Sequence, residues 1–322
     1  MRLRRAPVLK GAAVAGVFLL GGSFTPDAAA RMRCSYSGAP ENLLTVTTDR
    51  DSLGEVTRSG EVTTSGQEIF VMEFGEFPSR CRGGVPTVLN TDTIKVLSRG
   101  GLDFVDVPIG RGPFAPGATP ELEGASEIEI EFEFEANFSF AGVVGTRRAD
   151  EIHWGPGPGN HPGLNLNPGD AGDRDVDVTV RGLGAFLIAN GAAGNDTIVP
   201  APGAPFPNDG VVSVGGRGDD QLIAPRNTWG SLGGEAGDDV LTGGRQDDNL
   251  FGGGGNDRLR SAGGPDSLRP GAGRDLVFGG PGRDRVNSRD SHRDRVRCGA
   301  GRDRVKADRR DRLRGCEVVR RR

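Results

Sequence analysis

Aspartate recurs at intervals of nine residues in the second half of this 322-residue chain. The regularly spaced positions are Asp239, Asp248, Asp257, Asp266, Asp275 and Asp284. Glycine stands two residues before each of them except at Gln246, and leucine or valine stands two residues after each. Carboxylate and peptide carbonyl oxygens are the ligands that Ca²⁺ prefers. The spacing therefore indicates a repeated site for a hard divalent cation.

The elements that could position these carboxylates are short. Nine residues suit one tight turn and one short strand, and glycine supplies the positive φ angles that tight turns need. A single aliphatic side chain per repeat cannot form a core alone, so successive repeats must stack and share one. Stacking places equivalent aspartates in columns about 4.8 Å apart. Unpaired carboxylates this close repel one another, which predicts cations between the repeats.

The repeat resembles the RTX, or hemolysin-type, calcium-binding nonapeptide G-G-x-G-x-D-x-U-x. Residues 252–260 (GGGGNDRLR) and 279–287 (GGPGRDRVN) match that motif fully, and the other repeats lack one or two of its glycines. A glycine-rich disordered linker is the alternative interpretation, but a linker has no reason to keep leucine or valine at one phase.

The resemblance implies that Ca²⁺ is the cofactor and that two nonapeptides form one coil. Ligands on one side would then be eighteen residues apart, with Asp239, Asp257 and Asp275 in one column and Asp248, Asp266 and Asp284 in the other. The turns whose carbonyls complete each site would depend on Gly237, Gly255, Gly264, Gly273 and Gly282.

Fainter copies of the repeat precede the regular array. They carry an aspartate two residues before an aliphatic residue, at Asp150, Asp196 and Asp220. Residues 215–223 (GGRGDDQLI) fit the motif well, so Asp220 joins the predicted cation ligands. Two segments rich in proline and glycine, 153–163 and 200–210, are expected to be loops that protrude from the coils. The sequence therefore predicts an all-β fold, a right-handed parallel β-solenoid that ends in an RTX-like β-roll.

Four sections are expected along the chain. Residues 1–30 have the features of a secretory signal peptide, with basic residues, an apolar run at 11–22 and a cleavage site at Ala28–Ala30. Residues 31–144 are expected to be an irregular β-rich section of the solenoid, 145–233 degenerate coils with loop insertions, and 234–322 the regular repeats with an arginine-rich, disulfide-stapled end. The apolar run is short for a bilayer span. We therefore expect a secreted or cell-surface protein with no membrane span after cleavage.

Alternation of residue types is clearest at 127–140 (EIEIEFEFEANFSF). Isoleucine and phenylalanine fall on one face of the expected strand and glutamate falls on the other. The glutamate face is either a second cation-binding surface or a solvated sheet face. The solvated face is favoured, because no turn glycines accompany these carboxylates to provide carbonyl ligands.

Four cysteines, at Cys34, Cys81, Cys298 and Cys316, lie in two pairs near the two ends of the expected mature chain. Export favours disulfides. Because the cysteines are grouped in this way, we predict the bridges Cys34–Cys81 and Cys298–Cys316. A metal site formed by these cysteines is less favoured, since the chain contains no C-x-x-C spacing.

The sequence offers no catalytic residues that stand out. It has neither the H-E-x-x-H motif of metalloproteases nor the G-x-S-x-G motif of lipases. Of its histidines, His153 and His161 flank one loop and could share a metal, although exposed loop residues are the favoured interpretation, and His292 stands apart. We expect a structural or adhesive calcium-binding protein. A polysaccharide-active enzyme on a β-helix scaffold and a passive solenoid that binds little calcium are the alternatives.

The C-terminal section is strongly basic. Residues 283–322 contain 16 arginines and lysines against 7 aspartates and glutamates, although the whole chain has a formal charge of −4. This section could bind an anionic cell-surface polymer. Alternatively, arginines beside Asp294 and Asp303 could neutralise these aspartates and replace the cation, which is the favoured interpretation. Nucleic acid is not expected, because aromatic residues that could stack on bases are absent from this section.

Overall fold

The computed structural model describes residues 32–38, 43–48, 58–65, 68–73, 81–82, 93–98, 103–108, 129–134, 140–145, 147–157, 161–166, 178–181, 186–201 and 210–321. Within these ranges the regular structure is entirely β-strand. They also include no helix that could traverse a lipid bilayer. The predicted signal peptide and most of the predicted loop at 200–210 lie outside the described residues. The prediction of a loop at 153–163 is wrong, because residues 153–157 and 161–163 are strand residues that pair antiparallel with each other.

The strands of the N-terminal half are β1 (Met32–Ser37), β2 (Leu43–Thr48), β3 (Arg58–Ser65), β4 (Glu68–Glu73), β5 (Thr93–Ser98), β6 (Asp103–Pro108), β7 (Glu129–Phe134), β8 (Phe140–Val144), β9 (Glu151–Gly157), β10 (His161–Asn165) and β11 (Val178–Arg181). Those of the C-terminal half are β12 (Phe186–Ala193), β13 (Thr197–Pro200), β14 (Val211–Arg217), β15 (Gln221–Ile223), β16 (Gly230–Ala236), β17 (Val240–Thr242), β18 (Asn249–Gly254), β19 (Arg258–Arg260), β20 (Ser267–Ala272), β21 (Leu276–Gly282), β22 (Arg285–Ser288), β23 (Arg295–Gly301), β24 (Arg304–Ala307), β25 (Arg312–Arg314) and β26 (Val318–Arg321).

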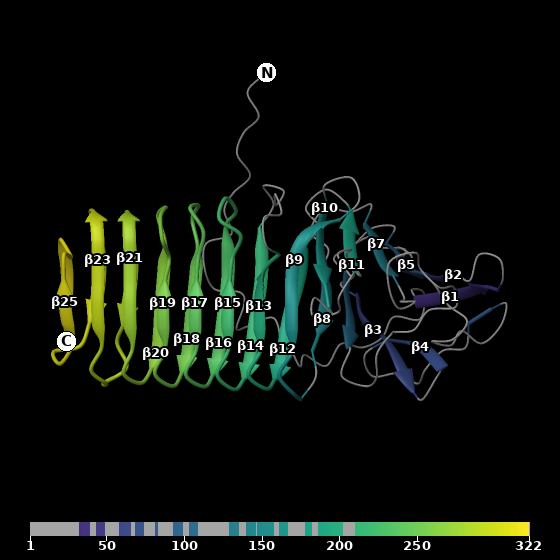
Figure 1. Cartoon of the computed structure of the whole chain (residues 1–322), viewed down its shortest axis with the longest axis horizontal. Helices are drawn as coiled ribbons and strands as arrows, with labels where there is room; N and C mark the ends of the chain where they lie inside the picture. The colour runs from purple at the N-terminus through teal and green to yellow at the C-terminus, as the bar shows by residue number, and fades with distance from the viewer. Residues whose placement is uncertain are drawn as a thin grey trace, which may run out of the picture.

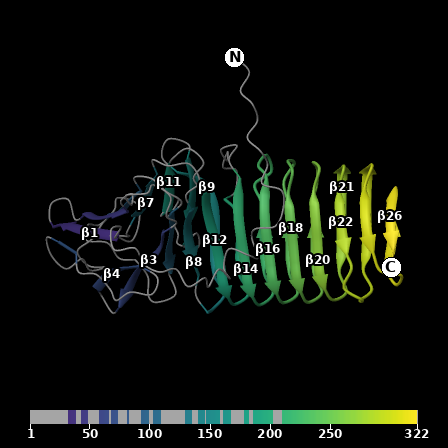
Figure 2. The same cartoon turned by 180° about the vertical axis from the view of Figure 1, so that it is seen from behind.

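These strands form two sheets that face each other along the long axis of the molecule (Figures 1 and 2). From β12 onward, odd-numbered strands lie in the 14-stranded sheet and even-numbered strands in the 12-stranded sheet. Each coil therefore contributes one strand to each sheet, and equivalent strands of successive coils pair in parallel, such as β17 with β19 and β18 with β20. The predicted parallel β-solenoid with two nonapeptides per coil is confirmed.

The core of the array is a line of the single aliphatic residues that each repeat supplies. These side chains are at most 2% exposed and comprise Leu241, Leu250, Leu259, Leu268, Val277, Val286, Val296 and Val305. In a strand as short as β19, alternation points Leu259 inward and its neighbours Arg258 and Arg260 outward. A nine-residue repeat with one apolar position can therefore fold only as part of a stack.

The turns between strands rely on left-handed backbone conformations. Of the five glycines predicted to permit them, four have positive φ, at 138° for Gly237, 139° for Gly255, 117° for Gly264 and 144° for Gly273. Gly282 departs from that expectation, because its φ lies outside the left-handed region. A Cβ atom there would nevertheless collide with the carbonyl oxygen of Gly264 in the preceding coil, so close backbone approach still requires glycine.

The N-terminal half is less regular than the C-terminal half. Antiparallel pairs β1–β2, β3–β4 and β9–β10–β11 occur among its parallel pairs. In β7, Ile130 and Phe132 are buried, whereas Glu131 and Glu133 face outward. The Lys95 amine lies 2.8 Å from a Glu133 oxygen and 3.7 Å from a Glu131 oxygen. The part of the glutamate face that the structure describes is thus engaged by a lysine.

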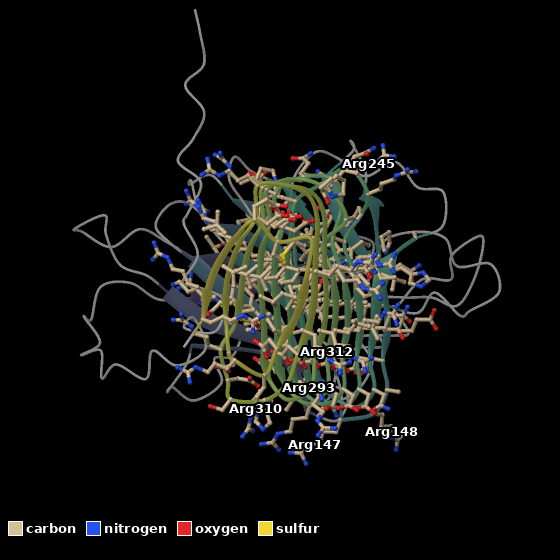
Figure 3. The ribbon with its side chains drawn as sticks, turned by 90° about the vertical axis from the view of Figure 1, so that its left-hand side faces the viewer. Arg147, Arg148, Arg245, Arg293, Arg310 and Arg312 are labelled. Atoms are coloured by element: carbon tan, nitrogen blue, oxygen red, sulfur yellow. A yellow bond between two sulfur atoms is a disulfide. The ribbon has the colours of Figure 1, made fainter. Side chains whose placement is uncertain are left out.

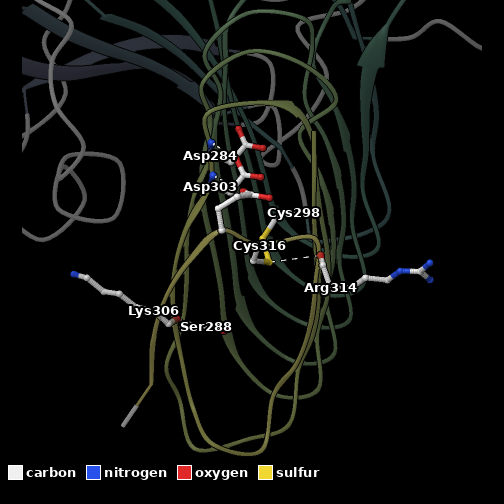
Figure 4. The surroundings of a disulfide bond; sticks show 8 residues. Asp284, Ser288, Cys298, Asp303, Lys306, Arg314 and Cys316 are labelled. Atoms are coloured by element: carbon white, nitrogen blue, oxygen red, sulfur yellow. Dashed lines mark hydrogen bonds between the residues drawn. A yellow bond between two sulfur atoms is a disulfide. The ribbon is translucent and has the colours of Figure 1, made fainter. Parts of the chain in front are cut away.

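Two disulfides hold the cysteines in the predicted pairing. Cys34 is joined to Cys81, and Cys298 to Cys316. The second bridge links positions 18 residues apart on consecutive coils and lies inside the ribbon, beside Asp284 and Asp303 (Figure 4). Cys298 is fully buried, so this bridge occupies the interior of the last coils.

Candidate metal centre

The repeat aspartates form two columns of buried carboxylates, each located immediately before a strand. In one column, each aspartate comes just before a strand of the 14-stranded sheet; its members are Asp196, Asp220, Asp239, Asp257, Asp275, Asp294 and Asp311. In the other column, each aspartate comes just before a strand of the 12-stranded sheet; its members are Asp248, Asp266, Asp284 and Asp303. All of these residues are at most 5% exposed. Both columns predicted from the sequence are present, and both extend beyond the predicted members.

Within a column, each carboxylate is tied to the neighbouring coil by one oxygen. The backbone amide of Asp239 donates to Oδ1 of Asp257 at 2.9 Å, and that of Asp257 donates to Oδ1 of Asp275 at 2.8 Å. In the other column the amide of Asp266 donates to Oδ1 of Asp284 at 3.0 Å. This repeated bond fixes the rotamer of each aspartate and orients its second oxygen.

The second oxygen, Oδ2, is left without a partner in nine of the eleven column members. Among the described residues, nine column aspartates have a buried Oδ2 with no hydrogen bond, at Asp196, Asp220, Asp239, Asp257, Asp266, Asp275, Asp284, Asp294 and Asp303. A buried carboxylate oxygen without a partner is strongly unfavourable unless a cation or a proton compensates for it. The regularity of this feature indicates a repeated ligand rather than isolated strain.

A small polar cradle lies next to several of these oxygens, in the coils whose nonapeptide begins with glycine. A Cβ atom on Gly234 would collide with Oδ2 of Asp239 and would lie 2.7 Å from the carbonyl oxygen of Gly252, one coil further on. Equivalent crowding by Oδ2 and a carbonyl occurs at Gly252 and Gly279. Glycine at this position therefore keeps open a space bordered by one carboxylate oxygen and one peptide carbonyl.

Burial raises the pKa of these carboxyl groups well above 3.8. The pKa is about 6 at Asp220, Asp257 and Asp284, about 7 at Asp196, Asp239, Asp266, Asp275 and Asp294, and about 8 at Asp248. Hydrogen bonds from backbone amides lower these values, and most column members are raised further by nearby carboxylates. Near neutral pH the columns thus favour either protons or a bound cation.

The residues present fit Ca²⁺. The Oδ2 atoms and the first-position carbonyls are hard oxygen ligands, and the carboxylates supply the negative charge. When bound, Ca²⁺ would supply the positive charge that relieves repulsion within the column. The chain itself holds the carboxylates in register through the amide-to-Oδ1 bonds and excludes bulk water from the cradle.

Some coils depart from this arrangement. Oδ2 of Asp248 accepts the Gly244 amide at 2.7 Å, and this turn carries Gln246 where the motif has glycine. At Ser261 the first-position hydroxyl donates to the Gly279 carbonyl at 2.5 Å and so occupies the cradle. The predicted ligand set is therefore chemically uneven: Asp248 has both oxygens hydrogen-bonded to the chain, whereas most of the other members have only one.

The favoured expectation that arginines neutralise the last aspartates is wrong. Oδ2 of Asp294 and of Asp303 is buried and has no partner, just as in the preceding coils. Arg293, Arg295 and Arg304 are exposed, because residues next to an inward-facing aspartate point away from the core. Figure 3, viewed along the stack, shows labelled arginines such as Arg310 outside the ribbon. Sequence adjacency suggested pairs that the strand geometry separates.

The sequence prediction also omitted members of the columns. Asp196, Asp294 and Asp303 carry the same unpartnered oxygen as the predicted ligands, and their signal was the aliphatic residue two positions later.

Among the histidines, Nε2 of His153 lies 3.1 Å from a Glu151 oxygen, and Nδ1 of His292 lies 2.9 Å from an Asp290 oxygen. The side chain of His161 lies outside the described set.

Comparison with known protein families agrees with this geometry. A family profile described as the RTX calcium-binding nonapeptide repeat (4 copies) matches residues 233–268 and 263–292. No curated protein and no solved structure matches the chain significantly. Residues 233–292 are therefore RTX calcium-binding nonapeptide repeats, and Ca²⁺ is their ion.

Proposed function

We propose that this chain is an exported structural or adhesive protein whose repeat array folds together with Ca²⁺ binding. The observation that carries the proposal is the series of nine buried Oδ2 atoms without partners. In the absence of cations these oxygens oppose stacking, because each coil adds a charge to a column that already repels it. Calcium bound between coils would remove that opposition and make the stack stable.

The stability of the folded array should therefore depend steeply on calcium concentration. A ligand that binds only the folded state adds about 2.7 kcal/mol per site when its concentration is a hundredfold above Kd. The unfolded chain has no preformed cradle, so several sites fill together with folding. Calorimetric titration of the purified chain with Ca²⁺ tests this. Uptake of several ions with a gain of β-structure is expected, and a flat titration would favour a passive solenoid.

Export is supported by the basic and apolar N-terminal segment and by the presence of two disulfides. The intact mass of secreted material should correspond to a chain that begins near Arg31 and carries no free thiol. The proposal assigns no reaction to the protein. Cleavage of a uronate-containing polysaccharide by the purified chain would contradict it.

A second role is favoured by the outer face of the 14-stranded sheet, where arginines lie in two columns. Across strands β19, β21, β23 and β25, one outward column reads Arg258, Leu276, Arg295 and Arg312, and the other reads Arg260, Phe278, Arg297 and Arg314. Within the described part of the chain, no ion pair engages any of these six arginines. We propose that this arginine face binds an acidic cell-surface polysaccharide.

The geometry suits a linear polyanion without bases. Coils are about 4.8 Å apart and alternate residues of a strand about 7 Å apart, which gives a regular grid of guanidinium groups. Guanidinium carbons of Arg258, Arg260 and Arg297 lie 5.6, 5.4 and 5.6 Å from the centroid of the Phe278 ring. Because arginines already cover this ring, it offers no free platform for a nucleobase.

Retention on immobilised dextran sulfate and polygalacturonate, with neutral dextran as a blank, tests this role in calcium. Replacing Arg258, Arg260 and Arg295 with glutamine should abolish most of the retention. Replacing the exposed turn residues Arg245, Arg274 and Arg283 with glutamine removes the same charge elsewhere and should have a much smaller effect. Equal losses in the two triple variants, or stronger binding to single-stranded DNA than to either polysaccharide, would contradict an acidic-polysaccharide site.

A further inference from the structure

In the first column, the step between the coils of Asp275 and Asp294 differs from the regular steps between successive coils. An additional carboxylate takes part in its hydrogen bonds. In the regular steps, the amide of the fourth residue of the repeat donates to a backbone carbonyl of the next coil. Gly237 donates to Gly254 at 2.9 Å, and Gly255 donates to Ala272 at 2.9 Å. At the following step, the Gly273 amide instead donates to Oδ2 of Asp290, at 2.9 Å. A side-chain carboxylate has thus taken the place of a peptide carbonyl.

The cause is the irregular turn between β22 and β23. The regular turns combine two glycines of positive φ, such as Gly253 at 121° and Gly255 at 139°. Residues 288–294 (SRDSHRD) contain no glycine, and their one left-handed residue is Ser291 at 76°. The chain therefore takes a different path, with one extra residue, and Asp290 reaches the position that a carbonyl occupies elsewhere.

Asp290 is held firmly in this position. Its backbone amide donates to a carboxylate oxygen of Asp308 at 2.9 Å, and its Oδ1 accepts the His292 amide at 2.9 Å. The His292 ring contacts Oδ2 of Asp290, and the Asp290 side chain is 9% exposed. The turn is therefore fixed around this carboxylate, which is consistent with a preformed ligand position.

Asp290 lies against two column members that need a cation. One carboxylate oxygen from each of Asp275, Asp290 and Asp294 lies within 4.8 Å of the other two. Asp275 and Asp294 are 2% and 0% exposed, and Oδ2 of each has no partner. Because Ca²⁺–oxygen distances are about 2.4 Å, a single ion can contact three oxygens that are this close together.

We propose that Asp275, Asp290 and Asp294 form a three-carboxylate Ca²⁺ site that binds more tightly than the regular steps and fills at lower free calcium. The third carboxylate adds a charged oxygen beside the two column carboxylates, and the calcium affinity of oxygen sites rises with the number of charged ligands. The inference rests on the proposed calcium-dependent folding for the remaining coils. It adds that the step containing Asp290, a residue outside the nine-residue spacing, binds calcium before the remaining coils do.

Hydrogen exchange of the full chain in calcium-buffered solutions tests the site. Peptides covering 273–294 should gain protection at a free calcium concentration roughly tenfold lower than peptides covering 234–258. Asp290→Asn keeps an oxygen that can accept from Gly273 but loses the charge, and it should raise the midpoint for 273–294 to that of 234–258. The matched control Asp247→Asn removes an exposed charge from another turn and should leave both midpoints unchanged.

A second variant guards against a folding defect in Asp290→Asn. Asp290→Glu retains the charge and should keep the midpoint for 273–294 within about threefold of the unaltered chain. A single common midpoint along the array, or an unchanged midpoint in Asp290→Asn, overturns the three-carboxylate site but leaves calcium-dependent folding intact. Protection that is indifferent to calcium everywhere overturns both.

Discussion

The backbone amide of Asp257 donates to Oδ1 of Asp275, 2.8 Å away and 18 residues further along the chain. Oδ1 of Asp257 in turn accepts the amide of Asp239 at 2.9 Å. One oxygen of each of these aspartates thus holds the backbone amide of the preceding coil, and the other oxygen is left to a cation. Structural and ligand-binding roles are therefore divided between the two oxygens of a single carboxylate.

Removal of calcium should loosen the array over its whole length. Because Asp294 and Asp303 have the same unpartnered oxygen as the earlier members, we expect chelator to reduce hydrogen-exchange protection from β16 through β24. Peptides at 298–316 should lose less protection, because the Cys298–Cys316 bridge remains. Exchange measured with and without EGTA checks this, and identical protection in both would show that the columns do not depend on calcium.

The calcium-free protein should be more stable in mild acid than at neutral pH. Burial raises the pKa of Asp239 and Asp275 to about 7 and that of Asp248 to about 8, whereas unfolded aspartate titrates near 3.8. Between pH of about 4 and 7 the folded array holds protons that the unfolded chain has released, so stability falls as pH rises through this window.

Melting temperatures in EGTA at pH 5 and pH 8 measure this dependence. In EGTA the melting temperature should be higher at pH 5, and the increase produced by calcium should be larger at pH 8, where protons no longer compete for the carboxylates. A calcium-free melting temperature that rises steadily from pH 5 to pH 8 would contradict the assignment of protons and calcium to the same oxygens.

Substitution of Asp257 should lower the stability of the calcium-bound protein but should not lower it in EGTA. Asp257→Asn can still accept the Asp239 amide, but it removes one buried charge and one ligand. With calcium at a hundredfold above Kd we expect a loss of roughly 2.7 kcal/mol. In EGTA the variant should be as stable as the unaltered protein or more so. Asp238→Asn, at an exposed neighbouring position, should stay within about 0.5 kcal/mol in both conditions.

The Ser261 hydroxyl should act as a partial substitute for a cation. It fills the cradle beside Asp266 by donating to the Gly279 carbonyl. Ser261→Gly recreates the open cradle of the regular coils and should increase the number of bound calcium ions by one, as measured by calorimetry. Without calcium it should cost about 1 kcal/mol for the lost hydrogen bond and the added flexibility. Ser267→Gly, on an outward strand position, controls for flexibility alone and should add no ion.

The Cys298–Cys316 bridge should stabilise only the terminal coils. A loop of 18 residues corresponds to about 3 kcal/mol of stabilisation. Replacing both cysteines with alanine should accelerate exchange at 298–316 in saturating calcium and leave 234–258 unchanged, since coils contact only their neighbours. The matched Cys34/Cys81 double variant should leave 298–316 as it was.

Much of this architecture follows from spacing alone. The aliphatic residue at one phase of each repeat predicts the core line from Leu241 to Val286, and the aspartate two residues earlier predicts the two columns. In the N-terminal half, the position of strand β7 was also predictable from alternation. Such features are determined by short-range periodicity, which a sequence displays directly.

Other features depend on contacts between coils, which spacing does not display. The cradle at Gly234 exists because a carbonyl of the next coil comes close, whereas in the sequence this glycine has only the character of a turn residue. The arginines beside Asp294 are adjacent in sequence but point to the opposite side of the strand. Asp290 lies outside the nine-residue phase, so no periodicity marks it, and only the path of its glycine-free turn brings it to the column.

The alternation of the two sheets also sets the increments by which such an array can lengthen or shorten. Removal of 18 residues, such as 252–269, would join equivalent points of two coils and return Phe278 to the same sheet. Removal of nine would rotate everything downstream by half a turn about the long axis, so that the arginine face would pass to the opposite side of the molecule. The inherited unit of growth is therefore the pair of nonapeptides, although the unit visible in the sequence is the single one.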